Sequence, residues 1–398
     1  MYHDVKRRLP YYWRDIKDAL TYRVFARTVQ IYFVNVLPAI AFTLDMYRCT
    51  GQFFGINEAL FSSALAAMVF SLLACQPLTH RRCHRSDRIV QLHHLRRYHN
   101  VRALHIPNPA FTAWFRIWAA IFHWIVAFGN FSDYMAYVTD FSSETFGMYV
   151  GIIYCIRGVE ELVYLFEPTT LAGGYLSIVI AILYFGSVYG LEKLGSSTLW
   201  QPGFRGFLDD YAFVFPTFFW VGSYYFSGRL VDTKIYRIPV GGAFSPTRPR
   251  NWVIDFWNLE VKWVFVAVPF GFLMMLLSYF EHNVSSLTAQ ACQFPLKKPA
   301  GFHWDFFLLG FTCFVGGILG LPLPNSLVSQ APVHTDPLTI YQIKLEAIET
   351  KDGGEIRQPV VGAAAGTITG PLLTVVHIMP AAVFAGIFSV FGVSHAWS

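Results

Sequence analysis

The sequence has few charged residues for its length. Lys, Arg, Asp and Glu make up only 14% of its 398 residues, whereas 54% are hydrophobic and 18% are aromatic. A soluble globular domain has about a quarter of its residues charged. This composition argues against an ordinary soluble protein and favours a polytopic membrane protein.

Cysteine is also sparse, with six residues and no CxxC pair. Isolated cysteines in apolar segments are usually small buried hydrophobes. We therefore expect neither a disulfide framework nor a metal site built from paired cysteines. No cleavable signal peptide is recognisable at the N-terminus.

Long apolar runs are present instead, and several match the roughly 20 residues that a helix needs to cross a bilayer. A bilayer cannot hydrogen-bond a bare backbone, and these runs are too long and too uniformly apolar for barrel strands. We therefore expect an all-α polytopic membrane protein. The runs are Val24 to Met46, Phe61 to Cys75, Phe111 to Gly129, Phe146 to Phe166, Leu171 to Tyr189, Tyr211 to Phe226, Trp263 to Phe280, Phe306 to Leu321 and Gly370 to Val390.

Residues 1–23 form a basic N-terminal segment ahead of the expected membrane domain, residues 24–390. A helix there would place Tyr12, Ile16, Ala19 and Leu20 on one side with basic residues around them. This pattern is typical of a helix at a membrane interface. The excess of Lys and Arg favours a cytoplasmic N-terminus.

Two proline-interrupted segments are candidates for a ligand site, because transporters bind substrate where helices break near the bilayer midplane. The first is "LLACQPL", which contains Gln76 and Pro77, and the second runs from Gly317 to Tyr341. We expect Pro322 and Pro324 to end a helix and the letters "NSLVS" to be extended.

A new helix is predicted to begin at "SQAPVHT", with Ser329 as its N-cap. Its unpaired N–H groups and partial positive charge could hold an anion, or a neutral acid with hydroxyl groups, without any arginine. The alternative is a proline-rich loop at the membrane surface.

A carboxylate stands near the end of another apolar run, in "LLSYFEHNVSSL". Glu281 is a candidate functional residue because an ionisable group at membrane depth is costly, and Ser285 follows one turn later. Since the polar residues His282 and Asn283 come next, Glu281 could instead simply mark the end of the helix.

Several blocks together resemble the borate transporter branch of the bicarbonate and anion exchanger family, especially its fungal members. They are "YFVNVLPAIAF", "CQPL", "GFHWDFFLLG", "GLPLPNSLVSQAPVHTDPLTIY" and "GPLLTVVHIMPAAVFAGIF". The resemblance covers almost the whole chain. It implies two inverted repeats of seven helices, divided into a core and a gate domain, an elevator-like motion of the core, and a homodimer formed through the gate.

The resemblance also implies a substrate site between two half-helices and an acid. The acid would be Glu281, with Ser285 beside it, and the first half-helix would begin at Gln76 and Pro77. The second would begin at Ser329, Gln330, Ala331 and Val333. Gln330 stands where chloride–bicarbonate exchangers carry arginine. The implied activity is transport of borate, boric acid or a related inorganic anion, with export across the plasma membrane and no enzymatic chemistry, cofactor, metal or nucleic-acid partner.

The chain departs from the family directly after "CQPL". Where an apolar third helix is expected, it has "THRRCHRSDRIVQLHHLRR". Permitted codons for this stretch, read one base later, can spell "IVGVTGLIVLFNYTIYD", which is an apolar helix of the expected kind. We therefore interpret residues 80–105 as an out-of-frame segment. Arginines at bilayer depth would cost roughly 2.5 to 3.5 kcal/mol each, so we expect impaired transport by this chain.

Two other interpretations of this segment stay open. A polybasic loop could bind anionic lipid or a partner, giving a membrane protein that does not transport. Alternatively, the histidines and Cys83 could form a metal site of a membrane enzyme; the residues are His80, Cys83, His84, His93, His94 and His99.

The family pattern also predicts a missing stretch between Ala365 and Gly366, and further gate helices after the short C-terminal segment 391–398.

Overall fold

The structure is a computed structural model. It describes residues 1–18, 22–49, 53–75, 81–83, 109–167, 169–226, 233, 235–236, 245–247, 249–290, 301–326, 335, 339–340 and 355–356. Its helices are α1 (Tyr2–Asp18), α2 (Tyr22–Cys49), α3 (Ile56–Leu73), α5 (Pro109–Phe128), the 3₁₀ helix η1 (Phe131–Tyr137), α6 (Asp140–Tyr164), α7 (Leu171–Ser196), α8 (Pro202–Asp210), α9 (Val214–Phe226), α11 (Val261–Ala289) and α12 (Phe302–Leu319). Its strands are β1 (Arg81–Cys83), β2 (Pro324–Ser326), β3 (Thr339–Ile340) and β4 (Glu355–Ile356).

The predicted all-α architecture is confirmed, since the four strands contain only two or three residues each. Every predicted apolar run falls on a helix except Gly370 to Val390, which lies outside the described residues. Within the described part of the chain, five helices are long and apolar enough to cross a membrane: α3, α5, α7, α11 and α12.

The chain divides into two compact units that each combine distant segments. Unit 1 contains Met1–Phe25, Asp45–Thr139 and Phe244–Gly370, and unit 2 contains Ala26–Leu44, Asp140–Ala243 and Pro371–Ser398. The long helix α2 contributes its middle to unit 2 and both of its ends to unit 1.

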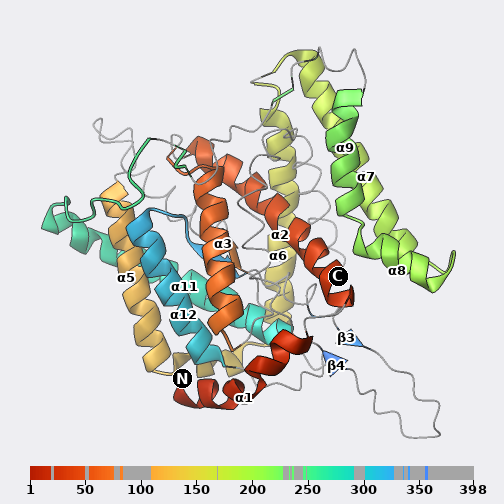
Figure 1. Ribbon diagram of the computed structural model, residues 1–398. Coiled ribbons are helices and arrows are strands. Elements are labelled where there is room, and N and C mark those ends of the chain that lie inside the picture. The colour runs from red at the N-terminus through yellow and green to blue at the C-terminus, as the bar shows by residue number, and fades with distance from the viewer. Residues whose placement is uncertain are drawn as a thin grey trace, which may run out of the picture. The chain divides into compact units, whose positions relative to one another are not determined.

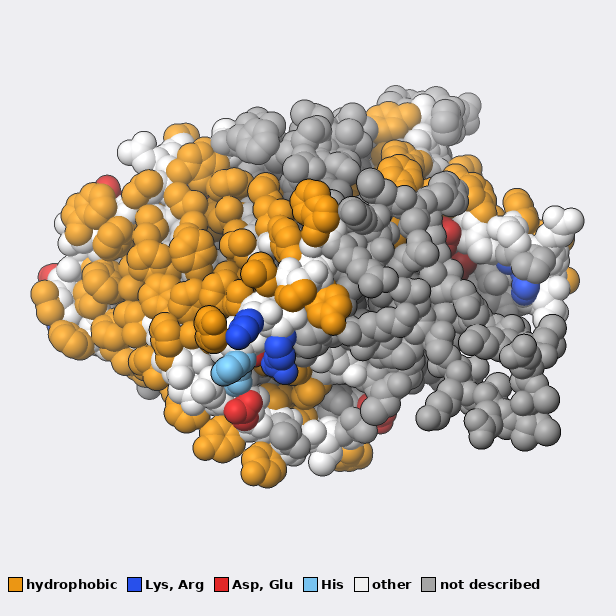
Figure 2. Space-filling view, turned by 60° about the horizontal axis from the view of Figure 1, so that its bottom comes forward, with side chains coloured by type: hydrophobic (Ala, Val, Ile, Leu, Met, Phe, Trp, Pro, Cys, Tyr) orange, Lys and Arg blue, Asp and Glu red, His pale blue; other side chains and the backbone are white. Residues whose placement is uncertain are grey.

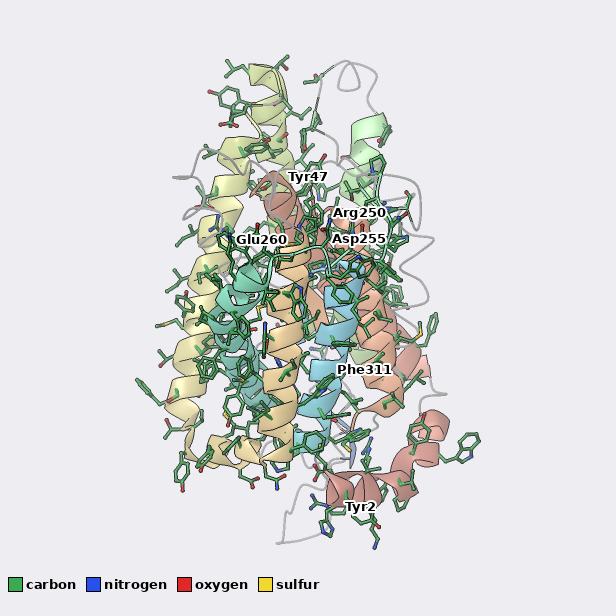
Figure 3. All side chains as sticks on the ribbon, turned by 90° about the vertical axis from the view of Figure 1, so that its left-hand side faces the viewer. Tyr2, Tyr47, Arg250, Asp255, Glu260 and Phe311 are labelled. Carbon is green, nitrogen blue, oxygen red and sulfur yellow. The ribbon has the colours of Figure 1, made fainter. Side chains whose placement is uncertain are left out.

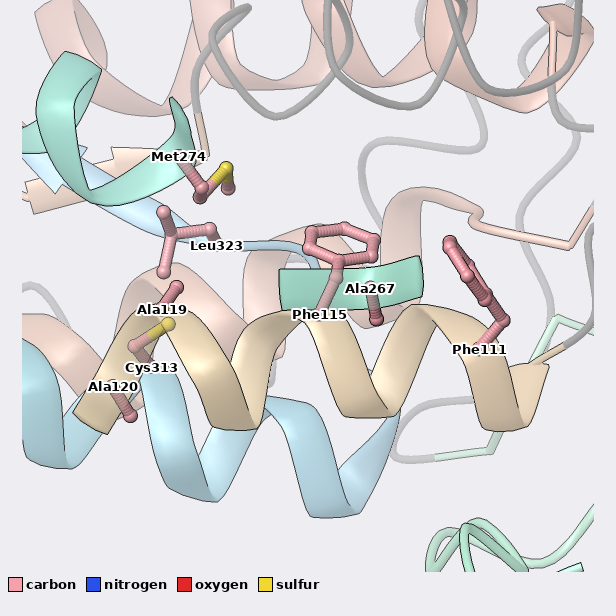
Figure 4. Close-up of a cluster of buried hydrophobic side chains, with 8 residues drawn as sticks. All are labelled: Phe111, Phe115, Ala119, Ala120, Ala267, Met274, Cys313 and Leu323. Carbon is pink, nitrogen blue, oxygen red and sulfur yellow. The ribbon is translucent and has the colours of Figure 1, made fainter. Parts of the chain in front are cut away.

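In unit 1, α5 packs against both α11 and α12, and α3 packs against α12 (Figure 1). A cluster of buried apolar side chains fills the space between α5, α11 and α12 (Figure 4). Phe115 and Ala119 of α5 contact this core together with Met274 of α11 and Cys313 of α12. Leu323, just before β2, belongs to the same cluster, so the chain leaving α12 is anchored in the core.

Glycines allow the two neighbouring helices to approach α5 closely. A Cβ on Gly271 of α11 would lie 2.6 Å from Trp118 Cβ and 2.8 Å from the Phe115 carbonyl oxygen. A Cβ on Gly310 of α12 would lie 2.9 Å from His123 Cβ. Such small residues at helix contacts are characteristic of membrane bundles.

Unit 2 is held together partly by polar contacts between α7 and α9. The Tyr184 hydroxyl lies 3.1 Å from Thr217 Oγ1, and the Trp220 indole N–H donates to Ser187 Oγ at 3.0 Å. Both bonds satisfy polar groups that would be costly to leave unpaired in an apolar environment.

The surface agrees with a membrane location. In the described part of the face seen in Figure 2, hydrophobic side chains cover most of the area and charged groups are few. Residues such as Ile125, Phe128 and Phe265 are more than half exposed. The predicted N-terminal helix is confirmed as α1, which exposes Trp13 and Leu9. Of the side chains predicted to share its apolar side, only that of Tyr12 is described, and it is 38% exposed.

Candidate functional site

The predicted acid, Glu281, lies inside a helix and not at its end. Helix α11 continues for two further turns to Ala289, so the helix-end interpretation of Glu281 is wrong. Glu281 is only 7% exposed and Ser285, one turn later, is fully buried. The two residues lie on the same side of α11 because they are four positions apart.

A short strand pair lies close to this helix. Strands β1 and β2 are antiparallel, with Arg81 opposite Ser326 and Cys83 opposite Pro324. Strand β2 lies against α11, and β1 lies against α3. The predicted extended piece "NSLVS" is therefore confirmed for Asn325 and Ser326, and its other three residues lie outside the described residues. A half-helix beginning at Gln76 does not continue through residues 81–83, because these form β1.

Helix α12 ends earlier than its prolines suggest. Its last residue is Leu319, and Gly320 follows with a left-handed φ of 62°. The N–H of Leu321 donates to the Gly316 carbonyl at 2.8 Å, as in a Schellman motif. The expectation that Pro322 and Pro324 end the helix is corrected: Gly320 ends it, since glycine reaches this conformation without steric cost.

Side chains from three other segments bind the carbonyls that follow α12. Arg116 of α5 donates to the Leu321 carbonyl and Ser62 of α3 donates to the Pro322 carbonyl. Arg250 donates to the Gly320 carbonyl at 3.1 Å. We call Arg116, Arg250 and Ser62 the carbonyl clamp. It fixes three consecutive residues immediately before Leu323 and β2, and cations at a helix C-terminus are electrostatically favourable.

A buried carboxylate supports this clamp. Glu58 of α3 has no exposed side-chain surface and lies 3.9 Å from Arg250. It also accepts hydrogen bonds from the Thr247 backbone N–H at 2.7 Å and from the Gly55 N–H at 3.0 Å. Burial lowers the pKa of the Arg250 guanidinium, while the charge of Glu58 raises it.

A second polar cluster lies at the opposite end of unit 1, where α1 packs; Figure 3 labels Tyr2 at that end and Arg250 at the other. The Asp305 carboxylate accepts a hydrogen bond from the Cys75 backbone N–H at 2.6 Å. Arg8 of α1 is 5% exposed; burial lowers its pKa, and the charges of Cys75 and Asp305 raise it. Asp305 thus attaches the beginning of α12 to the residue that precedes Gln76.

The structure places only part of the predicted site. Glu281 and Ser285 share one buried face of α11. The remaining predicted substrate-binding residues lie outside the described residues; they are Gln76, Pro77, Ser329, Gln330, Ala331 and Val333. All the proposed histidine ligands of the 80–105 segment also lie outside the described residues. Within the part of the chain that was described, no group of His, Cys, Asp or Glu is arranged to hold a metal ion.

Sequence reasoning missed the carbonyl clamp and Asp305. A signal was present for Arg116, because a single arginine inside the apolar run "AFTAWFRIWAAIF" is costly unless it faces a polar partner. Arg250 gave no comparable signal, since its partners, the carbonyls of Leu319 and Gly320, are distant in the sequence.

The whole chain matches a known family. The sequence model of the HCO3⁻ transporter integral membrane domain matches residues 1–175 and 167–396. The chain belongs to this family. The resemblance to the bicarbonate and anion exchangers is therefore confirmed, as is the prediction of a multi-pass integral membrane protein.

Two fungal proteins are similar to this chain over nearly all of its length. A Schizosaccharomyces pombe protein, named only as a transporter, is 40% identical over 403 residues, covering 98% of this chain and 77% of the relative. Boron transporter 1 of Saccharomyces cerevisiae is 36% identical over 402 residues, covering 98% of this chain and 69% of the relative.

A solved structure shares the fold of this family member. The transmembrane domain of a cyanobacterial bicarbonate transporter, BicA, superposes with a TM-score of 0.61 over 94% of this chain and 89% of its own. The two are 12% identical, so the likeness concerns the fold alone. That fold is an all-α polytopic membrane domain.

Proposed function

We propose that the chain transports boric acid, borate or a related inorganic anion across a membrane. The observation that carries the proposal is the 36% identity to boron transporter 1 over 98% of the chain. The family match and the fold of a bicarbonate transporter support the same class of substrate. The relatives named here are transporters, in agreement with the prediction that the chain is not an enzyme.

The substrate site in this proposal is centred on Glu281 and Ser285. Their burial on one face of α11, with β2 packed against that helix, supports this assignment. The starts of the two half-helices would complete the site through Gln76 and Pro77 on one side and Ser329 to Val333 on the other. With Gln330 in place of an arginine, that half of the site provides hydrogen bonds but no side-chain cation.

The finer features are proposals that follow from the family. We propose residence in the plasma membrane, a homodimer formed through the gate, and an elevator-like movement of the core domain. The separation of the chain into two units, each built from distant segments, is compatible with one unit moving against the other. Net boron export is the direction we propose.

The test is the boron content of yeast cells that lack their own boron exporter and express either this chain or its Glu281→Ala variant. Both proteins are quantified in the membrane fraction. The proposal predicts lower cell boron with the chain and no change with the variant. Cell boron that is unaffected by the chain would contradict the proposed function, and equal effects of both proteins would contradict the role of Glu281.

A matched comparison examines the basic segment 80–105. A variant carrying the apolar sequence "IVGVTGLIVLFNYTIYD" in place of the basic stretch should transport faster than the chain itself, because it restores the lipid-compatible third helix. Sequencing the transcript addresses the same point independently. A transcript that encodes His80 to Asn100 in frame would contradict the out-of-frame interpretation and favour a lipid contact.

A further inference from the structure

Ser278 of α11 carries a buried hydroxyl that does not bond to its own helix. Its side chain is fully buried, and its Oγ has no hydrogen-bond partner among the described residues. An unmade hydrogen bond at a buried hydroxyl typically costs about 1 to 3 kcal/mol, so such groups are rare unless a ligand or water completes them.

Several other buried hydroxyls on the helices form a hydrogen bond within their own helix. Each of these donates to a backbone carbonyl four or three residues earlier, as polar side chains in membrane helices commonly do. The examples are Thr43 to Ala39 at 2.6 Å, Ser177 to Gly173 at 2.8 Å, Thr217 to Phe213 at 2.6 Å and Thr312 to Leu309 at 2.8 Å. Ser278 makes no such bond, so its hydroxyl stays available. The Ser286 hydroxyl of the same helix also has no partner among the described residues, but it lies about 80° further around the axis.

The helical repeat places Ser278 on the face that carries Glu281 and Ser285. At 3.6 residues per turn, Ser278 and Ser285 are separated by about 20° around the axis, and Glu281 lies between them along the helix. The contacts of His282 show that the neighbouring side of α11 faces the interior of unit 1. Its ring stacks on Phe306 of α12 at 5.8 Å and meets Phe70 of α3 edge-on at 6.4 Å, inside unit 1.

The chemistry of this face favours a ligand with several hydroxyl groups. A carboxylate accepts O–H donors, and a serine hydroxyl both donates and accepts. The formal cation on α11 is Lys262, about 28 Å from Glu281 along the axis. Of the elements packed against α11, α5 carries Arg116, which donates to the Leu321 carbonyl, and also His123. Helix α12 carries Asp305 and His303, η1 carries Asp133, and β2 carries no charged residue. A carboxylate on the same face therefore disfavours an anion beside it, whereas uncharged boric acid, B(OH)₃, presents three O–H groups that match these partners.

We propose that Ser278 binds substrate together with Glu281 and Ser285, and that these groups recognise uncharged boric acid and not the borate anion. The inference rests on the proposed function. Because Ser278 contacts a hydroxyl of the substrate, its loss weakens binding and leaves the conformational steps of transport unchanged.

The test measures boric acid transport by the full chain in liposomes. Ser278→Ala should raise KM roughly 3- to 10-fold with little change in maximal rate, as expected for one lost hydrogen bond. Ser278→Thr keeps the hydroxyl and should keep a KM close to that of the original chain. Ser177→Ala is the matched control, since it removes a buried hydroxyl that already has a helix partner.

Methylboronic acid, in which one hydroxyl is replaced by methyl, supplies a second readout. The original chain should prefer boric acid over this analogue, and Ser278→Ala should lose most of that preference, because a site built to bind a hydroxyl rejects an analogue without it. This ratio is measured within each variant and does not depend on how much protein folds.

The outcomes separate the two proposals. Liposomes in which the original chain moves no boron would contradict the proposed function. Boron transport with an unchanged KM and an unchanged analogue preference in Ser278→Ala would overturn the role of Ser278 alone. Rates that follow the borate concentration at several pH values, and not the boric acid concentration, would overturn the choice of the uncharged acid.

Discussion

The backbone N–H of Cys75 donates to the Asp305 carboxylate at 2.6 Å, across 230 residues of sequence. The bond joins the chain just after α3 to the first turn of α12. Both residues are almost fully buried, and Arg8 of α1 lies close enough to interact electrostatically with them. Because Gln76 and Pro77 follow Cys75 directly, this contact positions the chain that enters the proposed substrate site.

Replacing Asp305 should therefore destabilise unit 1. Asp305→Ala removes an acceptor from a buried N–H and a charge from the neighbourhood of Arg8, which we expect to cost about 1.5 to 3 kcal/mol. The measurement is the Tm of the detergent-purified protein. Asp133→Ala is the control, because the Asp133 side chain is 80% exposed and its bond to His303 lies at the surface. Equal Tm values for the two variants would contradict the prediction.

Much of the fold follows from the sequence, because the length and apolar content of a membrane helix are local properties. Eight of the predicted runs coincide with helices for this reason. The pairing of β1 with β2 could not be predicted in this way, since each strand has only three residues and its partner is more than 200 residues distant. The predicted end of α12 was wrong because Gly320, which precedes both prolines, already adopts the left-handed conformation that ends the helix.

The candidate site likewise contains some residues that the sequence indicates and others that only the structure shows. Glu281 could be proposed as a candidate from the sequence because a carboxylate in an apolar run is unusual. Ser278 could not, since serine is common in membrane helices and only the structure shows which hydroxyls lack a helix carbonyl. The clamp residues depend on contacts between segments that only the folded chain brings together.

Arg116 should be essential for the stability of the carbonyl clamp. Arg116→Met keeps much of the side-chain volume but leaves the Leu321 carbonyl without its donor, and we expect a loss of about 2 kcal/mol. Its guanidinium also lies 5.1 Å from the Phe54 ring centre, a contact that methionine replaces only in part. Arg116→Lys should recover part of the loss by keeping the charge.

The measurement is the fraction of protein that remains monodisperse after heating, compared with Lys262→Met. Lys262 is 67% exposed, so its replacement should change stability by less than about 0.5 kcal/mol. An Arg116→Met protein as heat-resistant as Lys262→Met would show that the clamp contributes little.

Cys75 should react slowly with maleimides in the folded protein. Burial raises the pKa of its thiol, and the negative charges of Asp305 and Asp4 raise it further. The thiol therefore stays protonated in the fold above its ordinary pKa of about 9, where the unfolded chain releases the proton. Because the folded protein holds this proton more tightly than the unfolded chain, the thiol contributes to the stability of the fold. The contribution is fully present below about pH 9 and is lost as the pH rises towards the raised pKa of the folded state.

A variant that retains only Cys75 makes the thiol measurable. In the unfolded chain the labelling rate should level off above about pH 9, because the thiol is then ionised. In the folded protein the rate should keep rising with pH. Parallel pH profiles in the two states would contradict the raised pKa, whatever the absolute rates.

The close approach of α11 to α5 should make Gly271 intolerant of any side chain. The Cβ of Gly271→Ala would lie 2.6 Å from Trp118 Cβ and 2.8 Å from a backbone oxygen, so the helices must separate, which we expect to cost about 1 to 3 kcal/mol. Gly186→Ala on α7 is the matched control, because its Cβ meets nothing within 4 Å. Alanine there should stabilise the helix by about 0.5 to 1 kcal/mol. The two variants should therefore shift the Tm of the purified protein in opposite directions, and a shift in the same direction would refute the packing of α11 against α5 described above.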